Sequence, residues 1–138
     1  MRLDPTIDLP TPATGGAAGF DLAASVDVDI PPHGIRLVST GLVIAVPHGY
    51  FLGIFARSST PLKRGLIVAN GVGVIDADYC GPTDEIKIQV LNVTDASVRV
   101  LRGDRLAQGI VLPAPRIEWD EVAGMTVASR CGFGSTGA

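Results

Sequence analysis

The chain has 138 residues, of which 46% are hydrophobic and 18% charged, and its net charge is −3. This length suffices for one domain with a real core, so we expect a single domain over residues 1–138. The scattered Lys and Arg and the acidic balance argue against stable nucleic-acid binding. No apolar run approaches the roughly 18 residues that span a bilayer, and the first ten residues do not resemble a signal peptide. We therefore expect a cytoplasmic protein without membrane contact.

The predicted secondary structure is nearly all β, because 17 glycines and 10 prolines interrupt most windows that could form an amphipathic helix. In chain order, β-branched and apolar runs predict strands at residues 35–46, 51–57, 66–70, 85–93, 97–101 and 107–112. Turns are predicted between them at residues 31–34, 47–49, 60–65 and 102–104. Many short strands with such turns favour a sandwich or jelly roll.

The clearest strand signal is the segment EIKIQVLNV, residues 85–93. Ile86, Ile88 and Val90 alternate in it with polar residues, which predicts one buried and one solvated face. The only cysteines, Cys80 and Cys131, are too few for a disulfide framework and lack the spacing of a zinc site. We expect both to be free thiols.

The segment GVIDADYCGP, residues 73–82, carries two acids and a tyrosine in a glycine-bounded hairpin. Asp76 and Asp78 are two residues apart, so an extended backbone directs both to one face. Taken alone, the segment is equally compatible with a positioned catalytic acid and with an ordinary acidic turn.

Five ordered segments change that balance: AGFDLAAS at residues 18–25, ARSS at 56–59, NGVGVIDADYCG at 70–81, GDRLAQ at 103–108 and RCGFGSTG at 130–137. Together they resemble the five motifs of the homotrimeric dUTPase family, over nearly the whole chain. The resemblance implies an all-β jelly roll of the dUTPase-like β-clip type, assembled as a homotrimer with shared active sites. It also implies Mg²⁺-dependent hydrolysis of dUTP to dUMP and pyrophosphate, which lowers dUTP and supplies dUMP for thymidylate synthesis.

The resemblance implies that the hairpin binds the nucleoside and positions the attacking water. Asp76 would orient and deprotonate the water that attacks the α-phosphorus, a general-base role. The amide of Asn70 and hairpin backbone, including Gly73 and Val74, would bind the uracil edge. Tyr79 would lie against the deoxyribose and exclude a 2′-hydroxyl, which rejects UTP.

The resemblance also implies donors for the phosphates, because three phosphates bring roughly four negative charges. Arg57 would in addition orient Asp76. Asp21 would contact Mg²⁺ through bound water, while the phosphates supply the direct ligands. The phosphate-facing positions are Arg57, Ser58, Ser59 and Gln108.

The last motif predicts a flexible tail, at about residues 128–138, that closes over the active site. Phe133 would stack on the uracil, and Arg130 would approach the γ-phosphate. Gly134, Ser135 and Thr136 would cover the β- and γ-phosphates. Because the tail is expected to reach over a neighbouring subunit, a monomer is expected to be inactive.

The chain departs from the family pattern at two of these motifs. Cys80 stands where an arginine or glutamine is usual, and residues 82–84 resemble an insertion before the next strand. The arginine of the last motif usually stands five positions before the phenylalanine, where this chain has Ala128. Arg130 stands only three positions before Phe133. Of all the implied roles, the contact between Arg130 and the γ-phosphate is the one that this changed spacing affects most.

Two other functions remain as alternatives. A dCTP deaminase shares this fold and a similar serine-bearing segment, but it requires a glutamate as general base, whereas Asp76 and GFGSTG favour pyrophosphate release. A catalytically weak, nucleotide-sensing regulatory member of the fold would be compatible with Cys80 and the altered last motif. Turnover of dUTP separates the first expectation from both alternatives.

Overall fold

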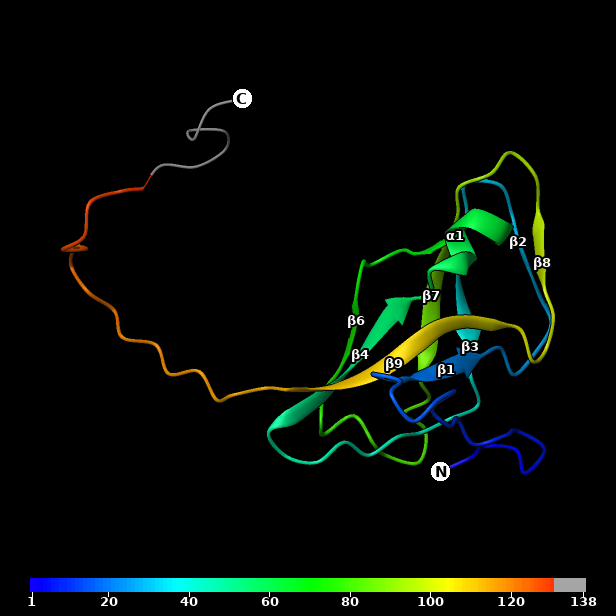
Figure 1. Cartoon of the computed structure of the whole chain (residues 1–138), viewed down its shortest axis with the longest axis horizontal. Helices are drawn as coiled ribbons and strands as arrows, with labels where there is room; N and C mark the ends of the chain where they lie inside the picture. The colour runs from blue at the N-terminus through cyan, green and yellow to red at the C-terminus, as the bar shows by residue number, and fades with distance from the viewer. Residues whose placement is uncertain (131–138) are drawn as a thin grey trace.

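The computed structural model describes residues 1–130, and within this range the chain forms nine strands and one short helix (Figure 1). The prediction of a nearly all-β chain is confirmed. The elements are β1 (Phe20–Ala23), β2 (Val28–Ile30), β3 (Ile35–Ser39), β4 (Tyr50–Ala56), α1 (Ser59–Arg64), β5 (Leu66–Val68), β6 (Gly73–Ile75), β7 (Lys87–Asn92), β8 (Val98–Val100) and β9 (Arg105–Pro113).

The strands form three antiparallel sheets with a jelly-roll-like arrangement. One sheet has the order β1-β9-β4-β6, the second pairs β2 with β8, and the third has the order β3-β7-β5. Strands from all three sheets contribute to one core cluster, in which Leu22, Ile30 and Ile88 are fully buried. The alternation predicted for residues 85–93 is confirmed, since Ile86, Ile88 and Val90 are buried while Lys87 is exposed.

Two predicted elements differ in the structure. The strand expected at 35–46 ends at Ser39, because Gly41 has a φ of 66°, a left-handed conformation incompatible with a strand. The turn expected at 60–65 is wrong, because residues 59–64 form α1. Pro61 fits in the first turn of this helix, where its missing N–H has no helical acceptor. Gly65, with a φ of 61°, ends the helix by donating its N–H to the Pro61 carbonyl.

Asn92, at the end of β7, is a fully buried polar residue that connects three backbone segments. Its Nδ2 donates to the carbonyls of Ile30, Pro31 and Ala96 at 3.0, 3.1 and 2.7 Å. Its Oδ1 accepts from the Thr94 N–H at 2.9 Å and from the Thr94 hydroxyl at 2.8 Å. This one side chain therefore joins the end of β2 to the turn that precedes β8.

We expect Asn92→Ala to lower the free energy of unfolding by about 2–4 kcal/mol, because it leaves buried backbone groups without partners. Chemical denaturation measures this change, and Gln89→Ala on the same strand is the control. Gln89 is only half-buried, so its removal should cost well under half as much. Equal losses for the two variants would contradict the proposed role of Asn92.

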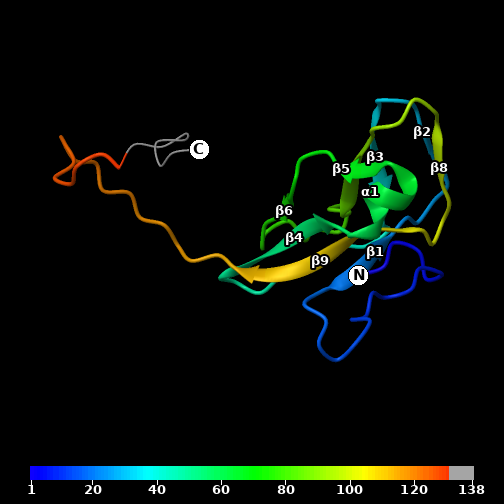
Figure 2. The same ribbon diagram turned by 45° about the horizontal axis from the view of Figure 1, so that its top comes forward.

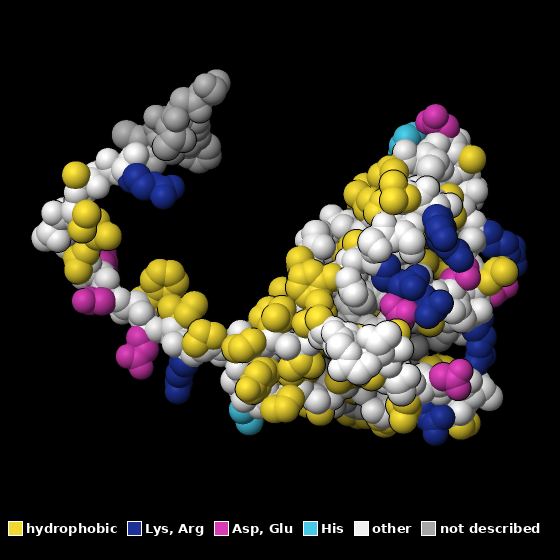
Figure 3. All heavy atoms as spheres, in the orientation of Figure 1, with side chains coloured by type: hydrophobic (Ala, Val, Ile, Leu, Met, Phe, Trp, Pro, Cys, Tyr) yellow, Lys and Arg dark blue, Asp and Glu magenta, His cyan; other side chains and the backbone are white. Residues whose placement is uncertain are grey.

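After β9, residues 114–130 form an extended segment that leads away from the sheets (Figures 1 and 2). Hydrophobic side chains line this segment and also gather on the face of the body nearest to it (Figure 3). The large exposed apolar residues of the segment are Ile117, Trp119, Val122, Met125 and Val127. Within residues 1–130, no helix has the length and apolar character needed to cross a membrane.

Candidate active site

The sheet β1-β9-β4 brings three of the five motifs together at one end. Asp21 on β1 is the register partner of Gln108 on β9, and Gln108 is in turn the partner of Phe55 on β4. Arg57 follows directly after β4. Residues that are up to 87 positions apart in the sequence, from Asp21 to Gln108, are therefore neighbours across adjacent strands.

Two guanidinium groups hold the Asp21 carboxylate. Arg57 Nε donates to Asp21 Oδ1 at 2.7 Å, and Arg105 Nη1 donates to Asp21 Oδ2 at 3.0 Å. Arg57 Nη1 also donates to the Arg105 carbonyl at 3.2 Å. Asp21 thus fixes the orientation of both arginines. Each Asp21 oxygen accepts one of these hydrogen bonds. The predicted water-mediated contact between Asp21 and Mg²⁺ stays a prediction.

The other residues predicted to face the phosphates lie beside this ion-pair group. Ser58 is exposed and directly precedes α1, and its hydroxyl does not cap the helix. Ser59 is half-buried in the first turn. Gln108 Nε2 donates to the Ala56 carbonyl at 3.2 Å, which fixes its amide next to the strand that carries Arg57. The four predicted positions therefore gather at one end of the sheet.

A bidentate ion pair fastens α1 to the turn between β8 and β9. Arg64 Nη1 and Nη2 donate to the two oxygens of Asp104 at 2.6 and 2.7 Å. These hydrogen bonds lower the pKa of Asp104 and raise the pKa of Arg64. Since Asp104 is adjacent to Arg105, the pair also sets the position of Arg105 relative to α1.

The hairpin motif lies on β6 and the turn that follows it. Asp76 is exposed, and its side chain makes no hydrogen bond or ion pair with any residue in the described part of the chain. Tyr79 donates its backbone N–H to the Asp76 carbonyl at 3.2 Å and its hydroxyl to the Glu85 carbonyl at 3.2 Å. Asn70 is exposed in the preceding turn, Gly73 is buried and Val74 is exposed.

The hairpin exit contains the residues that depart from the family pattern. Cys80 is an exposed free thiol, as expected, while Cys131 lies outside the described residues. The Gly81 N–H donates to Asp84 Oδ2 at 2.7 Å and closes a short turn. Glu85 then anchors the chain, because its Oε1 accepts from the Gly41 N–H at 2.8 Å.

The hairpin and the arginine group lie at opposite ends of β4. Gly73 pairs with Ile54 and Ile75 pairs with Leu52, so β6 runs away from the end of β4 that leads to Arg57. Five or six strand residues separate the two groups, which corresponds to roughly 17–20 Å. Within one chain, Arg57 therefore contacts Asp21 and lies far from Asp76. The predicted action of Arg57 on Asp76 is not made within one chain and stays a prediction.

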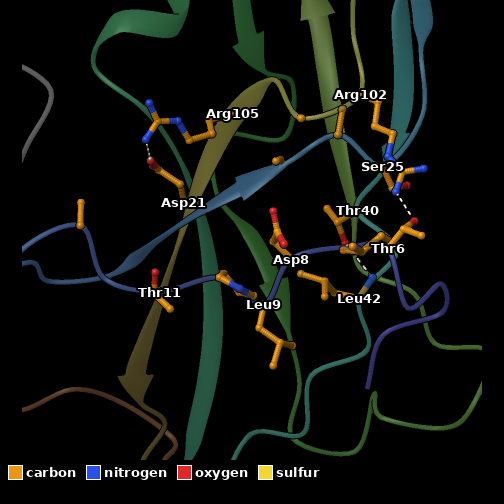
Figure 4. Close-up of a pocket in the computed structure, with 16 residues that line it drawn as sticks. Thr6, Asp8, Leu9, Thr11, Asp21, Ser25, Thr40, Leu42, Arg102 and Arg105 are labelled. Atoms are coloured by element: carbon orange, nitrogen blue, oxygen red, sulfur yellow. Dashed lines mark hydrogen bonds and ion pairs between the residues drawn. The ribbon is translucent and has the colours of Figure 1, made fainter.

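Two cavities adjoin Arg105. One, of about 410 Å³, lies between α1 and the turn at 103–105, and its lining includes Arg57, Ser59, Lys63 and Asp104. The other, of about 370 Å³, lies beneath the N-terminal segment and contains Asp21 but none of the other predicted site residues. Figure 4 shows this second cavity, with Asp21 and Arg105 joined at one side.

The remaining predictions concern the metal and the tail. Among residues 1–130, no three His, Cys, Asp or Glu side chains come together as a metal site. Arg130 is exposed in the extended segment after β9. The predictions for Phe133, Gly134, Ser135 and Thr136 fall outside the described residues. Arg105 was not predicted as a site residue, because Gln108 was the only residue of the segment GDRLAQ to which the resemblance assigned a role.

Taken together, these features define an all-β protein in which Arg, Ser and Gln donors gather at one end of one sheet. The dUTPase family model matches residues 6–137, and the chain belongs to this family. It is similar to the deoxyuridine 5′-triphosphate nucleotidohydrolase of Wolinella succinogenes, with 42% identity over 99% of this chain and 91% of that protein. It is 39% identical to the same enzyme of Caulobacter vibrioides, over 99% of this chain and 91% of that protein.

The fold is also similar to solved structures. The crystal structure of dUTPase from Streptococcus mutans matches with a TM-score of 0.79 and 38% identity, covering 86% of this chain and 94% of that chain. A Staphylococcus bacteriophage 80alpha dUTPase in complex with dUpNHpp matches with a TM-score of 0.88, over 100% of this chain and 96% of that chain. At 23% identity, the phage structure supports the fold alone.

Proposed function

We propose that this chain is a dUTP diphosphatase that hydrolyses dUTP to dUMP and pyrophosphate at sites shared between the subunits of a homotrimer. The single observation that carries the proposal is the convergence of Arg57, Ser58 and Gln108 at one end of the sheet, as the family motifs require. The reaction would lower dUTP and supply dUMP for thymidylate synthesis.

The phosphate half of the site consists of donors that need little rearrangement. Asp21 holds the Arg57 guanidinium through Nε, which leaves Nη2 free to donate to a phosphate oxygen. Ser58 supplies an exposed hydroxyl, and Ser59 and Gln108 extend the set. Charge-assisted hydrogen bonds from such groups stabilise the negative charge that accumulates as pyrophosphate leaves.

Asp76 is the general base of the proposal. Its carboxylate is exposed and unpaired among residues 1–130, so it is available to accept a proton from water. The water oxygen forms a bond to the α-phosphorus, the bond from that phosphorus to the bridging oxygen of the β-phosphate breaks, and Asp76 takes the proton. The products are dUMP and pyrophosphate.

Base and sugar selection would fall to the hairpin. Asn70 and the backbone at Gly73 and Val74 bind the uracil edge, and thymine or cytosine would leave polar groups unpaired, which costs about 1–3 kcal/mol per group. Tyr79 packs against the deoxyribose and excludes a 2′-hydroxyl. The hydrogen bond from its hydroxyl to the Glu85 carbonyl supports this role, because it restrains the ring.

A shared site is supported by two features of the single chain. Asp76 and Arg57 lie at opposite ends of β4, so one chain alone does not place them side by side. The segment after β9 exposes a series of apolar side chains, with Trp119 92% exposed. Such a series on an extended segment is expected to be covered by another subunit.

We also propose that the required divalent metal is Mg²⁺ and that it enters with the triphosphate. Among residues 1–130, no three His, Cys, Asp or Glu side chains come together as a metal site, so phosphate oxygens would be its main ligands, with Asp21 contributing through water. When bound, the ion neutralises phosphate charge.

Residues 1–138 would form one domain, whose tail at about 128–138, including Arg130 and Phe133 to Thr136, closes over the nucleotide of a neighbouring subunit.

The test is to incubate the purified chain with Mg²⁺ and each of dUTP, UTP, dTTP and dCTP, and to measure pyrophosphate. We expect rapid release from dUTP and at least about 100-fold slower release from the others, because a polar site rejects analogues that leave its groups unpaired. Ammonia release from dCTP would identify a deaminase instead. Tight dUTP binding without pyrophosphate release would identify a regulatory protein.

A further inference from the structure

The turn between Tyr79 and β7 provides the hydrogen bond that restrains the Tyr79 side chain. Among residues 1–130, the Tyr79 hydroxyl makes a single hydrogen bond, which it donates to the backbone carbonyl of Glu85 at 3.2 Å. Because 41% of Tyr79 is exposed, packing restrains only part of the ring. The position of the Glu85 carbonyl therefore determines where the outer edge of the ring lies.

The Asp84 carboxylate closes this turn. The Gly81 N–H donates to Asp84 Oδ2 at 2.7 Å, and the Asp84 N–H donates back to the Gly81 carbonyl at 3.1 Å. A Cβ at residue 81 would lie 2.9 Å from Asp84 Oδ2, so glycine leaves room for the carboxylate to approach this N–H. The Glu85 N–H then donates to the Thr83 carbonyl at 2.9 Å. Local hydrogen bonds of this kind fix the backbone path of residues 81–85.

The Glu85 carboxylate fastens the same turn to the body of the protein. Its Oε1 accepts from the Gly41 N–H at 2.8 Å, and its Oε2 accepts from the Ser39 hydroxyl at 3.3 Å. Lys87 Nζ lies 3.6 Å from Oε2 and balances the charge. Only 15% of the Glu85 side chain is exposed, so little water competes for these contacts. Glu85 therefore contacts Tyr79 through its carbonyl and the segment after β3 through its carboxylate.

We propose that Asp84 and Glu85 are positioning residues for Tyr79 and thereby determine how strongly the site discriminates between deoxyribose and ribose. The inference rests on the proposed function, in which the Tyr79 ring excludes a 2′-hydroxyl. Rejection of a single hydroxyl requires the ring to keep its place within about 0.5 Å. A hydrogen bond to a carbonyl that is anchored by two carboxylates meets this requirement. Residues 82–84, which depart from the family pattern, are thus part of the sugar-selecting structure.

The experiment measures kcat/KM for dUTP and for UTP in wild type and in Glu85→Ala. We expect the ratio of the two values to fall about 5–10-fold, the usual effect of losing one hydrogen bond. The fall should come from a higher value for UTP, because a loosened ring admits the 2′-hydroxyl, whereas a variant that only folds less well loses both activities equally. Glu85→Gln, whose amide oxygen still accepts from the Gly41 N–H, should restore most of the ratio. Asp84→Ala should lower it in the same direction.

Tyr79→Phe tests whether Glu85 acts through the tyrosine hydroxyl. The variant keeps the ring and loses the hydroxyl, so the ratio should fall by a similar factor. In the double variant with Glu85→Ala the two losses should not multiply, because both changes remove the same hydrogen bond. Losses that multiply would show that Glu85 acts elsewhere and would overturn the inference.

Asn92→Ala is the matched control, since it weakens the opposite end of β7 and its hydrogen bonds do not involve the hairpin. It should lower stability and leave the ratio unchanged, and circular dichroism verifies that each variant is folded. If wild type cleaves dUTP but Glu85→Ala keeps the wild-type ratio, the positioning role is overturned.

Calorimetric titration with dUMP and with UMP separates this inference from the proposed function, because it requires no turnover. Wild type should bind dUMP more tightly than UMP, and Glu85→Ala should reduce this preference. If wild type does not cleave dUTP, yet its preference for dUMP still depends on Glu85, the proposed reaction fails while the positioning role remains.

Discussion

Replacing Asp76 by Asn should lower kcat for dUTP by about 10²–10⁴-fold, because the amide cannot accept the proton of the attacking water. Asn has nearly the same shape as Asp, so the hairpin and the nucleotide contacts should persist. Single-turnover kinetics with saturating dUTP measure the chemical step. Calorimetry with the non-hydrolysable analogue dUpNHpp should show an affinity close to that of wild type.

The control for this variant is Asp78→Asn. Asp78 is also exposed and lies two residues further along the same turn, so it matches Asp76 in charge and setting. It should retain kcat within a few-fold. Equal rates for wild type and Asp76→Asn would remove Asp76 from the mechanism, and equal losses in the two variants would point to a general effect of charge.

Mixing two inactive variants should restore activity if each site takes its hairpin and its arginine group from different chains. Asp76→Asn keeps Arg57, and Arg57→Ala keeps Asp76. In randomly reassembled trimers from an equal mixture, about a quarter of the sites receive both intact groups, so about a quarter of wild-type activity is expected. Each variant alone should be at least about 100-fold impaired, the typical effect of losing a base or a charged donor. Co-refolding followed by a pyrophosphate assay measures the recovery.

The matched control mixes Arg57→Ala with Gln108→Ala. These residues lie at the same end of the same sheet in one chain, as the hydrogen bond from Gln108 to the Ala56 carbonyl shows. Every site in such a mixture would contain one damaged group, so no recovery is expected. Recovery in this control, or none in the first mixture, would contradict the division of the site between chains.

Local sequence patterns predicted the parts of the fold that depend on side-chain alternation. Ile86, Ile88 and Val90 gave a correct buried face for β7, because a one-sided strand has a period of two. Short length alone does not decide success, since the three-residue strands β5 and β8 were predicted. The strands β1, β2 and β6 were missed because each contains Asp or Gly, which are depleted in strands. Helix α1 was missed because its six residues begin with Ser and Thr and include Pro61, a composition typical of turns.

For the candidate site, the motif resemblance identified residues that lie together in the structure. It did not predict that one chain separates the arginine group from the hairpin. The prediction that Asp21, Arg57 and Gln108 converge agrees with the register of β1, β9 and β4. The separation of Arg57 from Asp76 depends on the direction of β6 along β4, which linear spacing does not encode. The role of Arg105 in holding Asp21 was also invisible, because nothing in GDRLAQ specifies where its arginine points.

Trp119 has a practical consequence. It is the only tryptophan of the chain, and 92% of its surface is exposed on the segment after β9. An indole in water emits at longer wavelengths than one packed against apolar groups, and it is readily quenched by small solutes. The fluorescence emission maximum of Trp119 therefore reports whether this segment lies in solvent or against another surface.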